Sequence, residues 1–327
     1  MSCLPLPFAP EHRRDVVRRQ WRELQGACVA AVAALAFGAA VTGASAQDIE
    51  PRTYSNAPIG VNFLVGGYAY TKGGLSFDPA LPISDPLLKT SNAVLGYARV
   101  IELGGQSAKI DVIAPYTWLS GTAVYRGDPV ERVVDGFGDV SFRLSANLYG
   151  APALGMKEFL SYEQDLIVGA SLRVTAPVGQ YDNRRLVNIG ANRWSVKPEA
   201  GVSKAFGPWT MELKAGANIY TDNTDFNYGG TRSQGNIYSA GWHVIRAFAN
   251  GMWASLDATY FGGGRTTING ERSNDLQQNW RVGATLAVPV DRQHSVKFYA
   301  SSGVSDRTGN NYDLLGIAWQ YRWGGGL

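Results

Sequence analysis

Charged side chains recur at every second position in several apolar stretches of this 327-residue chain, and their spacing is the feature that could do chemistry. Lys197 and Glu199 form one such pair, and Lys109 and Asp111 form another. A spacing of two residues puts both side chains on one face of a β-strand. Charges of both signs on one face can pair with each other or attract a charged or polarised solute.

Catalytic and metal chemistry have few candidates. His294 lies in a predicted turn, and His243 has no G-x-S-x-G motif and no evident Ser or Asp partner, as a serine hydrolase would need. The only cysteines are Cys3 and Cys28. Residues 222–225 (Asp-Asn-Thr-Asp) lack the Gly and Glu of a calcium loop, so we interpret them as a solvated loop tip. We expect no catalytic residue, no metal site and no cofactor.

Twelve segments of alternating polarity are the elements that must position these charges. In residues 139–149, apolar side chains at even positions alternate with polar ones at odd positions. This period of two residues indicates a strand, because a helix would spread both kinds around its axis. The predicted strands are 61–71, 91–102, 109–121, 139–149, 165–176, 193–206, 209–220, 236–249, 252–261, 279–290, 295–304 and 313–323.

The last strand has one apolar face with aromatic residues at its end. Leu315, Ile317, Trp319, Tyr321 and Trp323 share this face. Eleven residues suffice for a tilted strand to cross a bilayer, and aromatic residues are enriched at the membrane interface. A terminal aromatic strand also resembles the assembly signal of bacterial outer-membrane proteins, although four residues follow it here. We therefore expect the assembly machinery as a partner of this strand.

Long and short connections alternate between the predicted strands. Residues 124–136, 222–235 and 262–278 are long polar loops, whereas 104–105 and 207–208 are short turns. Outer-membrane barrels have short periplasmic turns and long extracellular loops. The sequence thus predicts an all-β fold, a transmembrane antiparallel up-and-down barrel of about 12 strands with both termini periplasmic. The connection 150–164 is long for a periplasmic turn and has room for a helical turn.

The N-terminal region has the features of an export signal. Five arginines precede an uncharged apolar run from Ala27 to Val41, and Ala44-Ser45-Ala46 is a cleavage motif. The alternative is a buried N-terminal helix. We predict a signal peptide at 1–46, an irregular lead at 47–60 and the barrel at 61–327. The lead is polar and long enough to reach inside the barrel.

Composition excludes several classes of protein. Charged residues make up 17% of the chain and the mean hydropathy is −0.14, which is too polar for a helical membrane protein. Residues 1–46 hold five arginines and three acids, so the remainder has 25 basic and 24 acidic residues of the total 30 and 27. This near-neutral balance gives no reason to expect nucleic acid as a partner. Without Cys3 and Cys28, the mature chain would have no thiol.

If the apolar faces contact lipid, the opposite faces line the lumen. The predicted inward charges are Lys109, Asp111, Arg143, Arg173, Lys197, Glu199, Glu212, Lys214, Asp257, Arg281, Lys297 and Arg322. Bases outnumber acids, which favours a positive constriction for anions or polarised solutes. The alternative is a ladder of paired charges that stabilises a narrow barrel.

The lumen also has candidates for an aromatic wall that contacts a flat solute: Tyr68, Tyr70 and Tyr299. The alternative is that these three rings only fill space. One face of the first predicted strand carries Val61, Phe63 and Val65, and the other face carries Asn62, Tyr68 and Tyr70.

Short motifs in a fixed order resemble the outer-membrane transporter family named for the meta-pathway of phenol degradation. They are 136–140 (Gly-Phe-Gly-Asp-Val), 177–182 (Pro-Val-Gly-Gln-Tyr-Asp), 190–194 (Gly-Ala-Asn-Arg-Trp), 196–199 (Val-Lys-Pro-Glu) and 220–226. The resemblance spans nearly the whole mature chain. It implies a β-barrel that passes aromatic or other hydrophobic compounds, and it brings no catalytic residues.

We therefore expect an outer-membrane channel for passive passage of small hydrophobic or aromatic molecules. Its partners would be the membrane lipid and the solute. The alternative is a structural or adhesive barrel with a closed lumen and functional extracellular loops. An outer-membrane hydrolase that uses His243 is a third hypothesis.

Overall fold

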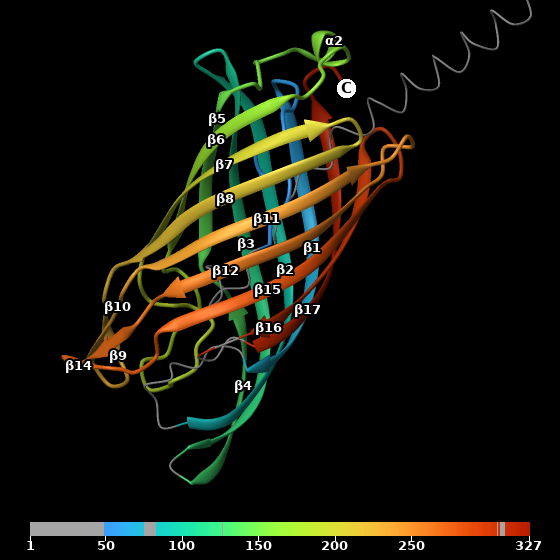
Figure 1. Cartoon of the computed structure of the whole chain (residues 1–327). Coiled ribbons are helices and arrows are strands. Elements are labelled where there is room, and N and C mark those ends of the chain that lie inside the picture. Colours follow the sequence, from blue (N-terminus) through green and yellow to red (C-terminus); the bar gives the residue numbers. More distant parts are fainter. Residues whose placement is uncertain (1–48, 75–82, 126, 306, 308–310) are drawn as a thin grey trace, which may run out of the picture.

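The computed structural model describes residues 49–74, 83–125, 127–305, 307 and 311–327. Among these residues, twelve strands close into one antiparallel barrel (Figure 1). They are β1 (Val61–Gly74), β2 (Ile83–Leu103), β3 (Gln106–Tyr125), β5 (Val140–Tyr149), β6 (Leu166–Ala176), β7 (Ser195–Phe206), β8 (Trp209–Tyr220), β11 (Ile237–Ala247), β12 (Trp253–Gly263), β15 (Gln277–Pro289), β16 (His294–Ser305) and β17 (Asn311–Gly324).

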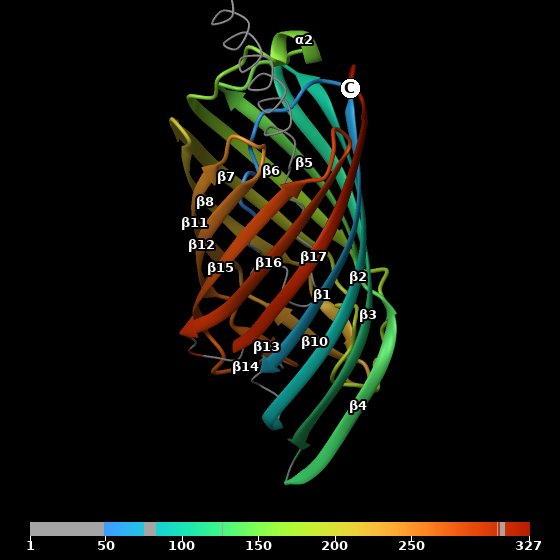
Figure 2. The same cartoon turned by 90° about the vertical axis from the view of Figure 1, so that its right-hand side faces the viewer.

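The first and last strands close the barrel. β1 pairs antiparallel with β17 from Val61 opposite Gly324 to Gly74 opposite Asn311, and it pairs with β2 on its other side. Closure gives each of the twelve described wall strands a neighbour on both sides, so none of them is an edge strand of the barrel. The start of β1 and the end of β17 lie at one rim, which we call the terminal rim, and the other end is the far end (Figures 1 and 2).

The strand positions confirm the predicted barrel, whereas parts of four predicted loops are strands. One is the loop before the predicted second strand, since β2 begins at Ile83 and not at residue 91. Residues 124–136 form the end of β3 and β4 (Asp128–Phe137). β4 and β5 both pair with β3 and lie in line, and a one-residue register change at Gly138-Asp139 separates them. β4 pairs with β3 along its whole length, and the two strands project together beyond the far end of the barrel (Figure 2).

The two other long loops also contain short strands. β9 (Asn223–Phe226) and β10 (Gly230–Gln234) lie in the β8–β11 connection, and β13 (Thr266–Ile268) and β14 (Glu271–Arg272) lie in the β12–β15 connection. They form one four-stranded sheet at the far end. Asp222, Thr224 and Asp225 are exposed, as expected for a solvated segment, but Asn223 is buried and residues 223–225 belong to β9 rather than to a loop tip. In the β5–β6 connection, α2 (Met156–Phe159) is the expected helical turn.

The two faces of the wall separate by polarity as predicted. Leu144, Leu172, Leu213 and Leu256 are exposed outward, and each is 43–70% accessible. Their polar neighbours along each strand are buried inside. A barrel that exposes an apolar band and buries its charges is suited to a bilayer. Within the described ranges, no helix is long and apolar enough to span a membrane.

The outer face carries an aromatic girdle at the terminal rim. The rings of Trp319, Tyr321 and Trp323 stack along β17 with centroids 5.4–6.3 Å apart. His294 stacks on Trp319 and Tyr321, at 5.6 and 5.0 Å. The predicted outward orientation of the apolar face of β17 is therefore confirmed.

β1 departs from the predicted sidedness. Val61, Phe63 and Val65 face the interior and are almost fully buried, in a cluster with Ala57 of the lead and Ile113 of β3. The interior is apolar here because the lead brings apolar side chains into the barrel. The rule that apolar faces contact lipid is wrong for this strand.

Candidate functional site: the barrel lumen

The lead occupies the lumen. Residues 49–60 precede β1, and Glu50, Thr53, Tyr54 and Asn56 are all at most 4% exposed. The segment is drawn in blue beside β1 in Figure 1. Its backbone belongs to no strand of the barrel sheet, and up to Tyr54 it is held by side chains that the wall directs inward.

Glu50 is the acidic centre of the contacts between the lead and the wall. Its carboxylate accepts hydrogen bonds from Arg143 and, at 2.7 Å, from Nη2 of Arg173. Nε of Arg143 also donates to Asp111 at 2.9 Å. Burial by itself raises the pKa of Glu50, but the nearby Arg143, Arg173 and Lys214 together hold that pKa well below its ordinary value. Glu50 therefore carries its charge at neutral pH and pairs the two arginines.

Lysines from three strands fix the backbone and ring of the lead. Nζ of Lys109 donates to the carbonyl of Thr53 at 2.6 Å, and Nζ of Lys214 donates to the carbonyl of Glu50 at 3.1 Å. Nζ of Lys197 lies 3.2 Å from Glu199, whose backbone carbonyl accepts the Tyr54 hydroxyl at 3.3 Å.

Glu212 binds the backbone of the lead. Its carboxylate accepts the backbone N–H of Arg52 at 2.6 Å and the Ser203 hydroxyl at 3.1 Å. The wall therefore contacts the lead through both cations and an anion. The charges are paired, as in the ladder alternative, but part of the pairing comes from the lead.

Two glycines of the wall form a slot for the Tyr54 ring. Gly169 of β6 and Gly201 of β7 are direct register partners. A Cβ placed on Gly169 would lie 2.3 Å from a ring carbon of Tyr54, and one on Gly201 would lie 2.5 Å from another. Only residues without side chains leave room for the ring at this depth.

The long β5–β6 connection holds the lead where it leaves the lumen. The Ile59 N–H donates to the Leu154 carbonyl at 2.9 Å, and the Asn56 amide donates to the Pro152 carbonyl at 3.1 Å. Met156 packs against the same apolar cluster as Ile59. These contacts explain why this connection at the terminal rim is longer than the others.

A loop narrows the far end. Val187, in the β6–β7 connection, packs against the inward side chains of Leu88, Leu119 and Tyr312 on the opposite wall. Asp139 anchors the same connection, since its two carboxylate oxygens each accept a backbone N–H at 2.8 Å, from Gly179 and Ala191.

The twelve predicted lumen residues all have buried or half-buried side chains, and eight of them bind the lead or a partner of the lead. These eight are Lys109, Asp111, Arg143, Arg173, Lys197, Glu199, Glu212 and Lys214. Arg281 lies toward the far end, where it stacks on Tyr312 at 3.8 Å, and Arg322 lies at the terminal rim. Lys297 lies 5.5 Å from the Tyr299 ring.

The predicted aromatic wall is wrong for two of its three members. Tyr68 and Tyr70 are 45% and 37% exposed on the outside of β1, because the inward positions of this strand are taken by residues that pack on the lead. Tyr299 points inward, where its ring covers Gly316 of β17. The interior aromatic that the sequence did not identify is Tyr54 of the lead.

His243 has partners that the sequence did not reveal. Its Nδ1 lies 2.7 Å from Oδ1 of Asp257, and the Ser255 hydroxyl donates to the other Asp257 oxygen at 3.0 Å. Asp257 thus lies between Ser255 and His243. A serine nucleophile needs the histidine as its direct base, so this order does not form a catalytic triad.

Comparison with known proteins identifies the family. The family model described as "Putative MetA-pathway of phenol degradation" matches residues 83–321. A COG4313 outer membrane channel from Pseudomonas putida F1 is 20% identical, with a TM-score of 0.70 over 84% of this chain and 100% of that one. The transport unit of the autotransporter AIDA-I from Escherichia coli is 9% identical, with a TM-score of 0.50 over 86% and 94%.

No curated protein matches this chain. The two structural similarities show the fold, which is that of outer-membrane barrels, and the apolar outer face agrees with the predicted location in that membrane. The family match covers well over half of the chain and confirms the resemblance seen in the short motifs. The chain belongs to the family described as "Putative MetA-pathway of phenol degradation".

Proposed function

We propose that this protein is an outer-membrane channel for passive passage of small hydrophobic or aromatic compounds, with the lead as its internal gate. The family supports the solute class, and the fold supports the location. The observation that carries the gate is that the segment in the lumen is held by side chains and is outside the barrel sheet.

Displacement of the lead would change the character of the lumen. Glu50 would leave the positions between Arg143 and Arg173, and the carbonyl acceptors of Lys109 and Lys214 would leave with it. The predicted inward charges comprise eight bases and four acids, so the opened lumen would be positive. Such a lumen favours anions and polarised solutes, among them aromatic compounds with an acidic hydroxyl.

We place the terminal rim in the periplasm and the far end outside the cell. The short turns and the α2 connection lie at the terminal rim, whereas the four-stranded sheet and β4 lie at the far end. In this orientation β17 presents its aromatic end to the periplasm, where the assembly machinery would recognise it. The lead then enters the lumen from the periplasmic side, after removal of residues 1–46.

Single-channel recording in a planar bilayer tests the proposal. The mature chain is compared with a variant that lacks residues 47–60, each with and without added phenol. We expect small conductance from the mature chain, and larger, anion-preferring conductance that phenol reduces from the shortened chain. Equal conductance of the two would show that the lead is no gate.

An absence of conductance from both chains would contradict an open pore. This holds if each chain has the heat-modifiable electrophoretic mobility of a folded barrel. That result would favour the structural or adhesive barrel. We assign no enzymatic step to the protein. His243→Gln tests the hydrolase hypothesis. Under our proposal, the unmodified chain and this variant both lack ester hydrolysis.

A further inference from the structure

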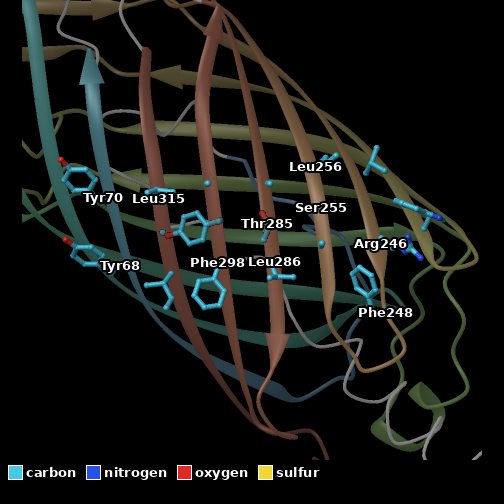
Figure 3. Close-up of a pocket in the computed structure, with 18 residues that line it drawn as sticks. Tyr68, Tyr70, Arg246, Phe248, Ser255, Leu256, Thr285, Leu286, Phe298 and Leu315 are labelled. Carbon is cyan, nitrogen blue, oxygen red and sulfur yellow. The ribbon is translucent and has the colours of Figure 1, made fainter. Parts of the chain in front are cut away.

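A groove of about 880 Å³ crosses the outside of the barrel wall (Figure 3). It extends over seven neighbouring strands, from β8 through β11, β12, β15, β16 and β17 to β1. Large outward side chains such as Leu256 and Phe298 stand along it. Outward-facing alanines leave the space between them: Ala254, Ala284 and Ala300.

The groove rises from the terminal rim toward the middle of the wall. At one end, Arg246 is one residue before the last residue of β11. Farther along, Phe298 is four residues after the first residue of β16, and Tyr68 is seven residues after the first residue of β1. Because the strands of such barrels tilt by about 35–45°, a path across them climbs through the membrane. The groove therefore begins at headgroup level and ends in the apolar band.

Arg246 forms the polar end of the groove. Its guanidinium carbon lies 5.1 Å from the ring centroid of Trp209 and 5.4 Å from that of Phe248, so two aromatic rings hold the cation at the rim. Among the described residues, no carboxylate lies within 4.0 Å of Arg246. A permanent charge on the outer face of a membrane barrel needs an anion or water at the interface.

We propose that this groove binds one phospholipid of the periplasmic leaflet, with its phosphate on Arg246 and one acyl chain along the three alanines. A phospholipid matches both parts of the groove, because phosphate forms paired hydrogen bonds with guanidinium and the acyl chain fills the apolar path. A small aromatic solute would match only the apolar part. The choice of leaflet rests on the orientation given under the proposed function, whereas the binding itself does not depend on solute passage.

Native mass spectrometry of the folded mature chain, released from detergent, tests the site. The probes are phosphatidylglycerol and a diacylglycerol with the same acyl chains. Arg246→Gln removes the charge and should weaken phosphatidylglycerol binding by about tenfold, the effect of one lost charge-assisted contact, while diacylglycerol binding stays unchanged. Arg99→Gln is the matched control, since Arg99 is an exposed outward arginine of β2 that does not line the groove.

A second pair of variants tests the path of the acyl chain. Replacement of Ala284 and Ala300 by Phe fills the groove and should reduce the binding of both lipids. Ala200→Phe adds the same ring on the exposed face of β7, outside the groove, and should leave binding unchanged. These substitutions point into the membrane and leave the interior packing intact.

Three outcomes would overturn the proposal. Equal loss of phosphatidylglycerol in the Arg246 and Arg99 variants would mean ordinary annular lipid. Unchanged binding in the Phe variant would mean that no chain lies in the groove. Lipid A serves as a third probe for the leaflet: if it binds in preference to phosphatidylglycerol and Arg246→Gln abolishes that binding, this rim lies in the outer leaflet and the orientation is reversed. If the chain without the lead shows no conductance, these lipid-binding results can still be interpreted, since none of them requires an open channel.

Discussion

At the scale of single residues, two of the contacts that hold the lead depend on one position each: a buried acid and a glycine slot. Glu50 lies between Arg143 and Arg173, and the Tyr54 ring lies against Gly169 and Gly201. A buried acid that pairs two cations is costly to remove, because both cations stay behind in the same low-dielectric surroundings. A glycine slot is sensitive to a single methyl group. Both contacts can be tested without a change to the barrel sheet.

Gly169→Ala should expel Tyr54 from its slot. The added Cβ would lie 2.3 Å from the ring, and overpacking of this kind costs about 1–3 kcal/mol. We expect the lead to leave the lumen more often and the single-channel open probability to rise several-fold. Gly67→Ala is the control, because its inward Cβ would have ordinary contacts at 3.7–3.8 Å and no contact with the lead. If Gly169→Ala also changes the open probability of a chain that already lacks residues 47–60, its effect arises from the wall and not from the lead.

Glu50→Gln should weaken the attachment of the lead to the wall, because it removes the negative charge that pairs with Arg143 and Arg173. Loss of one member of a buried ion pair costs roughly 3–5 kcal/mol, so the lead should be largely displaced. We expect conductance close to that of the lead deletion, with the preference for anions that Arg143 and Arg173 provide. Glu163→Gln changes an exposed acid of the β5–β6 connection and should leave the conductance unaltered. A Glu50 variant that behaves like the unmodified chain would contradict this role of the acid.

At the scale of elements, the β6–β7 connection depends on the bulge between β4 and β5. The register change at Gly138-Asp139 separates β4 from β5, and the Asp139 carboxylate binds the connection at Gly179 and Ala191. The same connection carries Val187 to the opposite wall. The short motifs at 177–182 and 190–194 therefore belong to one loop at the far end, and the motif at 136–140 anchors that loop.

Asp139→Ala should release this loop without unfolding the barrel. It removes two hydrogen bonds to a charged acceptor, each of which contributes about 1.5–3 kcal/mol. We expect trypsin to cut the folded variant faster after Arg184 or Arg185, which are both exposed. The midpoint of urea unfolding should stay the same. Asp128→Ala, an exposed position of β4, is the comparison, and equal cleavage rates in the two variants would argue against the anchor.

At the scale of the whole barrel, the two faces of the wall are stabilised by different partners. The bilayer contacts the outer face, and the lead contacts the inner face. The outer face is apolar in the middle of the strands and aromatic at the terminal rim. The inner face combines paired charges with an apolar cluster where β1, β2 and β3 meet the lead. We infer that the wall folds against lipid and that the lead adds an internal support.

Leu172→Lys tests the outer face. Leu172 is 47% exposed in the middle of β6, where a charge facing lipid costs about 2–4 kcal/mol. We expect that loss in the free energy of unfolding, measured by urea titration in phospholipid vesicles. Val290→Lys, in the β15–β16 turn at the terminal rim, should cost less than about 1 kcal/mol there. Similar losses at the two positions would mean that β6 does not face the apolar core of the bilayer.

Local patterns in the amino-acid chain were enough to define the elements of the wall and most of its sidedness. Alternation of period two is a local property, and in β5 and β6 it identified both the strands and the residues that point inward, such as Arg143 and Arg173. The order of long and short connections indicated which ends of the strands lie together. The short motifs identified the family, because their order along the chain needs no knowledge of their contacts.

The contents of the lumen, in contrast, depend on contacts between distant parts of the chain. Glu50 and Tyr54 lie in an irregular segment with no periodicity, and their partners are more than 90 residues away in the chain, so no local pattern reveals the contact. For the same reason the sequence misplaced Tyr68 and Tyr70: an apolar face signals burial, and it does not say whether lipid or the lead provides it. The pairing of His243 with Asp257 likewise required two strands to come into register.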